Sequence, residues 1–376
     1  MQNIQMVDLK SQYQKIKKEV DQGIQAVIDN TAFVKGTVVK DFEDNLANYL
    51  GTKHVISCGN GTDALQVAMM GLGLRPGDEV ITTSFTFIAT AEVIALLGLI
   101  PVLVDCDPNT YNITPAAIKK AITSKTKAIV PVHIFGQSAP MEEILEIAKQ
   151  NNLFVIEDNA QAIGADYTLN NGDKCKTGTM GDIGCTSFFP SKNLGAFGDG
   201  GAIFTDNDEL AEKIRAIVNH GMKVRYYHDY VGVNSRLDGI QAAILDVKLR
   251  HLDEYAAARN YAAQYYDKAF ANHKNIIIPA RYNKSNHVFH QYTMKLKGAD
   301  RDALKEYLNS KGVPMMVYYP VPLHLQKAYK DDRYSEGDFP ITECLSKSVF
   351  SLPMHTEMND DQLKYITDTV LEFFKK

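Results

Sequence analysis

Residues 54–65 read His-Val-Ile-Ser-Cys-Gly-Asn-Gly-Thr-Asp-Ala-Leu, which is a short apolar run followed by a glycine turn and the start of a helical segment. The same unit recurs along the chain. Further apolar or β-branched runs lie at residues 79–82, 101–104, 128–134, 153–156, 184–188 and 202–204. Such runs are typical of strands buried on both faces, and their alternation with helices is typical of a mostly parallel sheet. The pattern therefore predicts an α/β fold.

The length of the chain, 376 residues, favours two domains. We expect a large domain over residues 1–250 and a smaller C-terminal α+β domain over residues 251–376, which begins in a long linking helix. Apolar spacing outside the repeating unit supports this division. The predicted helices cover residues 7–30, 38–50, about 239–270, 301–311 and 359–376, and the predicted strands cover residues 291–296 and 317–319.

Charge and cysteine use exclude several kinds of partner. The formal net charge is −5 and no basic block is present, so nucleic acid is not an expected partner. The 5 cysteines have no metal-ligand spacing, and no metal is expected. The N-terminus lacks the apolar core of a signal peptide, and the longest apolar run is too short to cross a bilayer. We therefore expect a cytoplasmic protein with no membrane partner.

Ligands of such sheets bind beyond the carboxyl ends of the strands, so the residues after each run are candidate site residues. Residues 59–65 follow the first run, and free N–H groups at this helix start would bind an anion such as phosphate. The alternative is a plain capped helix with Asn60 or Thr62 as the cap. Phe87 follows the second run and either belongs to the core or lies against a planar ligand.

Two carboxylates follow the run at residues 153–156. A carboxylate directly after a buried strand is costly unless it is paired. We interpret Glu157 as part of a helix N-cap. For Asp158 the cap competes with a second role, which is to hold a cation such as a protonated ring nitrogen.

Residues 187–201 read Ser-Phe-Phe-Pro-Ser-Lys-Asn-Leu-Gly-Ala-Phe-Gly-Asp-Gly-Gly. Taken alone, Lys192 is a loop lysine beside a glycine-rich turn. A lysine that forms a Schiff base, however, must be held in place and must lose its proton near neutral pH. An anion-binding turn, a strand-terminal Asp158 and a held Lys192 are together what pyridoxal phosphate requires for its phosphate, ring nitrogen and aldehyde. Pyridoxal phosphate is therefore the predicted cofactor.

The chain resembles the sugar aminotransferases of the DegT/DnrJ/EryC1/StrS family, which are fold type I pyridoxal phosphate enzymes, over nearly its whole length. The segments that carry the resemblance are residues 59–65 (GNGTDAL), 84–91 (SFTFIATA), 157–164 (EDNAQAIG), 187–195 (SFFPSKNLG), 198–203 (GDGGAI), 232–244 (GVNSRLDGIQAAI) and 321–326 (VPLHLQ). The resemblance implies a large domain with a mostly parallel seven-stranded sheet between helices, plus a smaller α+β domain.

The resemblance also implies roles for single residues around the cofactor ring. Lys192 matches the Schiff-base lysine, which also moves the proton between cofactor and substrate. Asp158 matches the carboxylate at the pyridine nitrogen, and Gln161 matches the residue at the phenolic oxygen. Phe87 falls where the family stacks an aromatic side chain on the ring.

At the phosphate, the resemblance implies contacts from two parts of this chain and from a second one. Gly61, Thr62 and Ser187 match the phosphate contacts of the family. Asn234 matches an asparagine that reaches the phosphate from a partner subunit. A homodimer with shared active sites is therefore expected.

The resemblance further implies that an amino donor, glutamate in most such enzymes, gives its amino group to a UDP- or dTDP-linked keto sugar. The sequence of residues 157–164 and the loop at 226–230 resemble the branch of the family that aminates a UDP-2-acetamido-2-deoxy-3-oxo-glucuronate-like sugar. The resemblance implies that this sugar is used in the biosynthesis of surface polysaccharide such as lipopolysaccharide. A 4-keto-6-deoxy hexose is the alternative. The candidate substrate contacts are Arg225, His228, Tyr318 and His324; the alternative is a solvated loop and a structural histidine.

Three other functions compete with this one. Some relatives use the cofactor for dehydration, but they carry a histidine where this chain has Lys192. A non-catalytic, cofactor-binding regulatory protein would need the phosphate site without a complete proton-transfer set. An amino-acid aminotransferase would usually need an arginine for the substrate carboxylate.

Overall fold

The computed structural model describes residues 4–375, and its central sheet confirms the predicted α/β fold. Seven strands lie in the order β1-β9-β8-β5-β4-β2-β3. They are β1 (His54–Cys58), β2 (Glu79–Thr83), β3 (Ile100–Val104), β4 (Thr126–Val130), β5 (Phe154–Asp158), β8 (Ile183–Ser187) and β9 (Gly201–Thr205). All pairs are parallel except those of β9, which runs antiparallel to both of its neighbours, with Ser187 paired to Gly201.

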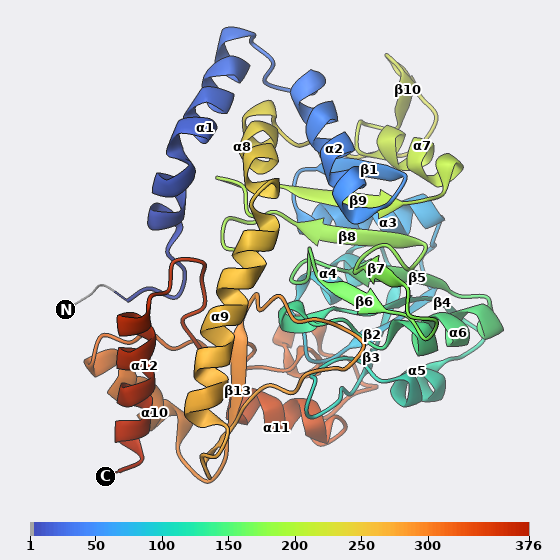
Figure 1. The fold of residues 1–376 in the computed structure, drawn as a ribbon. Helices are drawn as coiled ribbons and strands as arrows, with labels where there is room; N and C mark the ends of the chain where they lie inside the picture. Colours follow the sequence, from blue (N-terminus) through green and yellow to red (C-terminus); the bar gives the residue numbers. More distant parts are fainter. Residues whose placement is uncertain (1–3, 376) are drawn as a thin grey trace.

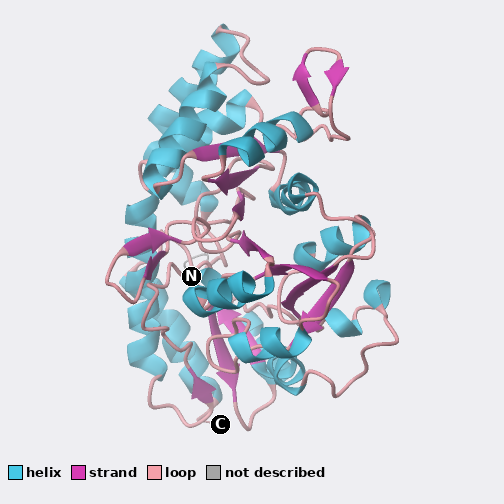
Figure 2. Ribbon diagram, turned by 90° about the vertical axis from the view of Figure 1, so that its right-hand side faces the viewer, coloured by secondary structure: helices cyan, strands magenta, loops and turns pink. Residues whose placement is uncertain are grey.

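Helices cover both faces of this sheet (Figures 1 and 2). The side chains of adjacent residues in a strand point to opposite faces of the sheet. Val55 and Ile56 of β1, for example, pack in two different hydrophobic clusters. One face packs against α3 (Gly61–Leu72), α4 (Ala89–Leu96) and α7 (Asp208–Ile217). The other packs against α2 (Thr37–Leu50), α5 (Pro115–Ala121), α6 (Met141–Asn151) and α8 (Gly239–Leu249), and α1 (Leu9–Asp29) lies on α8.

A second core lies in the C-terminal part of the chain, in gold to red in Figure 1. A small antiparallel sheet packs there against helices that follow one another along the chain. Its elements are α9 (Leu252–Phe270), β12 (Ile276–Ile277), β13 (Tyr292–Leu296), α10 (Arg301–Ser310), α11 (Pro340–Ser348), β14 (Val349–Leu352) and α12 (Asp360–Phe373). The division at residue 250 stays a prediction, and residues 1–3 and 376 of its two parts lie outside the described residues.

Two expected elements are wrong in detail. The helix expected over residues 239–270 is two helices, because the chain turns at Arg250–His251 between α8 and α9. Residues 317–319 form no strand. The ladder next to β14 is a single bridge from Met316 to Ser351, and the pairing does not continue along β14. The C-terminal helix ends at Phe373, and Lys376 of the expected span lies outside the described residues.

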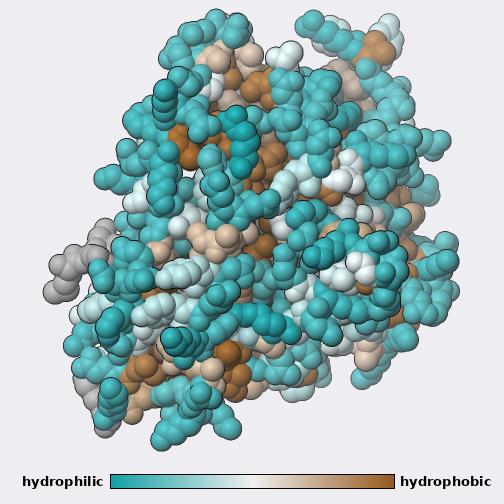
Figure 3. Space-filling model, viewed as in Figure 1, coloured by the Kyte–Doolittle hydropathy of each residue, from teal (hydrophilic) through white to brown (hydrophobic). Residues whose placement is uncertain are grey.

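Two hairpins that the sequence did not predict leave the central sheet. One is formed by β6 (Asp166–Thr168) and β7 (Lys174–Lys176), the other by β10 (Met222–Val224) and β11 (Tyr227–His228). The surface in the view of Figure 1 is mostly hydrophilic, with hydrophobic side chains showing between α1 and α2, over α8 (Figure 3). No helix within residues 4–375 has the length and apolar composition needed to cross a membrane.

Candidate active site

A cavity of about 820 Å³ opens beyond the carboxyl ends of the parallel strands. Residues from the ends of β5 and β8 line it, as do the start of α3 and the segment after β2. This is the place where sheets of this type bind their ligands. The cavity brings together Gly61, Thr62, Phe87, Asp158, Gln161, Ser187, Lys192 and Tyr318 of the sequence-predicted site residues.

The start of α3 lies against the end of β8 so closely that only glycine fits there. A Cβ on Gly61 would lie 2.5 Å from the Cβ of Ser187, and a Cβ on Gly201 would lie 2.5 Å from the carbonyl of Asn60. Asn60 caps the helix by accepting a hydrogen bond from Asp63 N at 2.8 Å. The helix start is therefore both capped and open to the cavity, where its dipole and N–H groups suit an anion. This cradle fits a phosphate group.

Asp158 ends β5 and is buried, yet it lines the cavity. Thr90 Oγ1 donates a hydrogen bond to its Oδ2 at 2.7 Å, and Ala160 N donates to its Oδ1 at 3.2 Å. Both donors are neutral, and together they fix the orientation of the carboxyl group. A carboxylate held in this way suits a cationic ring nitrogen.

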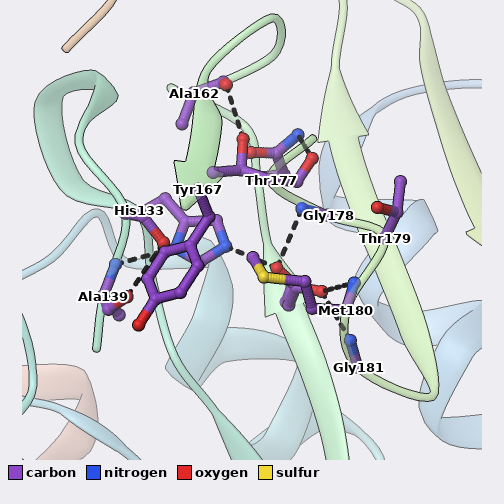
Figure 4. A network of polar contacts seen from close by, with 12 residues as sticks. His133, Ala139, Ala162, Tyr167, Thr177, Gly178, Thr179, Met180 and Gly181 are labelled. Atoms are coloured by element: carbon purple, nitrogen blue, oxygen red, sulfur yellow. Dashed lines mark hydrogen bonds and ion pairs between the residues drawn. The ribbon is translucent and has the colours of Figure 1, made fainter. Parts of the chain in front are cut away.

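Glu157 is not part of a helix cap, so its expected role is wrong. No helix begins after β5, because residues 159–164 form a turn that ends at Gly164 with a φ of +88°. The Glu157 carboxylate is fully buried and accepts hydrogen bonds from His133 and from the backbone of residues 178–181 (Figure 4).

Gln161 sits in this turn with both ends of its amide engaged. Its Oε1 accepts a hydrogen bond from Phe135 N at 2.6 Å, and its Nε2 donates to the hydroxyl of Tyr319 at 2.9 Å. Tyr319 also lines the cavity, and its ring centroid lies 6.2 Å from that of Phe87. Phe87 is 55% exposed, so it belongs to the cavity wall and not to the core.

Lys192 is half-buried in the turn after Pro190 and keeps part of its surface open to the cavity. Desolvation by the surrounding protein lowers its pKa to about 8, while the negative charge of Asp158 opposes this shift. A lysine with such a pKa exists partly as the free amine near neutral pH, as a nucleophile or general base requires.

The loop that carries Lys192 is tied down on both sides. Asn193 Nδ2 donates to the carbonyl oxygen of Val288 at 2.9 Å. The buried Lys248 of α8 donates to the carbonyl oxygen of Gly195 at 2.5 Å. Lys192 is thus presented by a loop that is held on both sides.

Four of the predicted site residues lie outside this cavity. Asn234 is exposed, and Arg225 and His228 lie on the exposed β10–β11 hairpin. The Arg225 guanidinium lies 4.9 Å from the ring centroid of Tyr226, and His228 Nδ1 lies 2.8 Å from the carbonyl oxygen of His220. The fourth is His324.

His324 is buried and does not line the cavity. One ring nitrogen lies 2.8 Å from Ser84 Oγ and the other 3.1 Å from Glu343 Oε1. These contacts are those of a histidine held between structural partners. Tyr318 is half-buried and does line the cavity.

Besides Tyr319, sequence reasoning missed two polar residues of the wall, His290 and Gln291, just before β13. His290 Nδ1 and Gln291 Oε1 are buried and have no hydrogen-bond partner in the described part of the chain. Burial, together with the positive charges of Lys192 and Arg259, lowers the pKa of His290 well below its ordinary value. No motif marks these residues, and only the fold brings them to the cavity.

Among residues 4–375, no group of three or more His, Cys, Asp or Glu side chains could hold a metal ion.

The sequence profile of the DegT/DnrJ/EryC1/StrS aminotransferase family matches residues 14–371. The chain is 48% identical to the "Pleiotropic regulatory protein" of Geobacillus stearothermophilus, with 99% of each chain covered. It is 46% identical to the UDP-2-acetamido-2-deoxy-3-oxo-D-glucuronate aminotransferase of Pseudomonas aeruginosa, with 96% of this chain and 98% of the relative covered.

Solved structures agree with the fold and with the family. DesV of S. venezuelae, solved in complex with a ketimine intermediate, superposes with a TM-score of 0.96 at 36% identity, covering 100% of both chains. NtdA of Bacillus subtilis, solved with bound cofactor PMP, has a TM-score of 0.89 at 32% identity, covering 99% of this chain and 83% of the other. The family match, the relatives and the arrangement of the cavity lead to one conclusion: this chain belongs to the DegT/DnrJ/EryC1/StrS aminotransferase family.

Proposed function

We propose that this aminotransferase uses pyridoxal phosphate to move an amino group from an amino acid, glutamate in the first instance, to a keto group of a nucleotide-linked sugar. One observation carries the proposal: the anion-binding start of α3, the carboxylate of Asp158 and the amine of Lys192 meet in one cavity. These three groups complement the phosphate, the ring nitrogen and the aldehyde of the cofactor.

When bound, pyridoxal phosphate supplies an electron sink that stabilises negative charge at the substrate carbon. The residues of this chain do the rest. Asp158 holds the proton at the ring nitrogen, with Thr90 as its hydrogen-bond donor. Gln161 would offer its amide to the phenolic oxygen, and Phe87 would hold the ring from the cavity wall. Lys192, whose pKa is lowered to about 8, moves the proton at its Nζ.

For the substrate, we propose a UDP-2-acetamido-2-deoxy-3-oxo-glucuronate-like sugar, used in surface polysaccharide such as lipopolysaccharide. The 46% identity to the Pseudomonas aeruginosa enzyme supports it. A dTDP-linked or 4-keto-6-deoxy sugar is the alternative. A regulatory role is kept as a second candidate because of the name of the Geobacillus relative.

We also propose a homodimer with shared active sites. Lys192 is the one lysine or arginine among the described residues that line the cavity, against Asp63, Asp158 and Asp199. A nucleotide sugar and glutamate are anions, so the site needs further cations. The exposed hairpin with Arg225 and His228 would supply them from a second copy, and Asn234 would reach the phosphate there.

Apolar exposure supports such an interface. Phe33, Phe189, Phe197 and Val231 are large apolar side chains left exposed in the single chain.

Of the remaining candidate substrate contacts, we keep Tyr318 as a substrate contact and assign His324 a structural role beside Ser84. All 5 cysteines are free, which fits a reducing cytoplasm, and we retain the two domains at residues 1–250 and 251–376.

The test is a turnover assay in reverse. The purified protein, loaded with pyridoxal phosphate, is given 2-oxoglutarate and a panel of amino nucleotide sugars, and glutamate formation is measured. We expect turnover with a UDP-linked 3-amino sugar and none with Lys192→Ala. Borohydride reduction followed by peptide mapping should place the pyridoxyl group on Lys192. A label elsewhere, or turnover by Lys192→Ala, refutes the proposal, while binding without turnover of any sugar favours the regulatory role.

A further inference from the structure

Glu157 directly precedes Asp158 in β5, and its side chain lies on the opposite face of the strand. Successive side chains of a strand point to opposite faces, and Asp158 takes the face that opens to the cavity. Glu157 is fully buried and is not among the residues that line the cavity. A buried carboxylate that no substrate can reach needs a structural explanation.

Four donors surround this carboxylate, and the residues that supply them are labelled in Figure 4: His133, Gly178, Met180 and Gly181. Its Oε1 accepts from the backbone N–H groups of Met180 and Gly181, both at 2.6 Å. Its Oε2 accepts from Gly178 N and from His133 Nε2, both at 2.8 Å. A carboxylate has only acceptor positions, and hydrogen bonds to an ionised acceptor are short and strong. Glu157 thus ties a histidine to the loop before β8.

The histidine of this cluster is oriented from both ends. Ala139 N donates to His133 Nδ1 at 3.1 Å, so the ring proton lies on Nε2 and points to Glu157. The backbone N–H of His133 donates to the carbonyl oxygen of Asp158 at 3.0 Å, and Asp158 N donates to the carbonyl oxygen of Pro131 at 2.9 Å. One residue therefore links the Glu157 carboxylate to the backbone that carries the Asp158 side chain.

The loop of the cluster reaches the second cofactor residue. Asn159 Nδ2 donates to the carbonyl oxygen of Thr177 at 2.9 Å, and Thr177 Oγ1 donates to that of Ala162 at 2.8 Å. Gln161 lies between these two anchor points of the turn. The loop at residues 177–181, which Glu157 holds by three amides, therefore braces the turn that presents Gln161.

We propose that Glu157 is a positioning residue for the cofactor ring. By holding His133 and the loop at residues 177–181 together, it fixes the Asp158 carboxylate and the Gln161 amide at the ring nitrogen and the phenolic oxygen. The inference rests on the proposed function, in which these two side chains contact the cofactor. The positioning role requires a carboxylate, whose two oxygens both accept hydrogen bonds. A glutamine at residue 157 would place an N–H donor against backbone N–H groups.

The test compares Glu157→Gln with the matched control Glu143→Gln, which changes an exposed glutamate of the neighbouring α6. In the cofactor-free protein, amide exchange at Gly178, Met180 and Gly181 should accelerate at least tenfold in the first variant. Its Kd for pyridoxal phosphate should rise about tenfold, and the pH midpoint of the visible band of the bound cofactor should shift. The control should match the wild type in all three measurements.

A lower melting temperature with unchanged cofactor affinity and unchanged pH midpoint would make Glu157 merely structural and overturns the inference. Asp158→Asn separates this outcome from a failure of the proposed function. If Asp158→Asn binds the cofactor as tightly as wild type, the proposed function itself fails. If only Asp158→Asn loses affinity, the positioning role alone is wrong.

If Glu157→Gln does not fold, Thr177→Val takes its place, because it removes only the hydroxyl that braces Ala162. It should weaken cofactor binding in the same direction and by a smaller factor. Wild-type affinity and an unchanged visible-band midpoint in Thr177→Val would refute the inference as well.

Discussion

Replacing Lys192 by methionine should stabilise the cofactor-free protein, although it removes the residue on which the proposed chemistry depends. Burial lowers the pKa of Lys192 from 10.5 to about 8. One pKa unit corresponds to about 1.4 kcal/mol, so the difference between 10.5 and 8 amounts to about 3 kcal/mol. Methionine has a similar length and no charge to desolvate.

The sign of the effect follows from proton binding by the folded and unfolded chains. Below pH 8 the lysine is charged in both the folded and the unfolded chain. The full cost of desolvating this charge therefore lowers the free energy of unfolding of the wild type. Between pH 8 and 10.5 the unfolded chain binds more protons, so wild-type stability gains up to about 1.4 kcal/mol per pH unit from this group. The advantage of Lys192→Met should therefore be about 3 kcal/mol at pH 7 and should vanish above pH 10.5.

Urea unfolding of the two cofactor-free proteins at pH 7, 8.5 and 10 measures this difference. Burial also raises the pKa of Cys58 and Cys185 above the ordinary thiol value, and this pH dependence is common to both proteins and cancels. Lys120→Met, which changes an exposed lysine of α5, serves as the control and should show no such dependence. A constant or absent difference between Lys192→Met and wild type across this pH range would refute the assigned burial of the amine.

Three further outcomes are expected. Gly61→Ala should weaken pyridoxal phosphate binding at least tenfold in a fluorescence titration, since its Cβ would lie 2.5 Å from that of Ser187; equal affinity would contradict the phosphate cradle. Thr90→Val removes a donor to the charged Asp158, worth about 1.5–3 kcal/mol, and should raise the Kd of the cofactor about tenfold or more. Mixed subunits of Lys192→Ala and Asn234→Ala, each inactive alone, should regain turnover; no recovery in verified hybrids would argue against shared sites.

Local pattern was enough to predict the central sheet, because each buried strand is a short apolar run between polar or glycine residues. The topological rule for such sheets then placed Asp158 and Lys192 at the same edge, and the cavity brings both together. Glu157 was misjudged because its partners come from His133 and residues 178–181, which no local signal connects to it.

The other differences also arise from tertiary contacts. His290 and Tyr319 enter the cavity from distant parts of the chain, and neither carries a motif. The break between α8 and α9 at Arg250–His251 falls on residues that do not disfavour a helix, so nothing in the sequence marks it.

The antiparallel course of β9 has a consequence for how Lys192 is held. In a βα crossover the chain would leave the sheet after β8 and return from the far end. Here Ser187 and Gly201 are paired across the ladder, so residues 188–200 form a closed loop whose two ends are joined by the sheet itself. The entropy lost on closing this loop is therefore already lost when the sheet folds. Cofactor binding does not have to close the loop a second time. Changes of length within this loop should alter the reach of Lys192 while leaving the strand register intact.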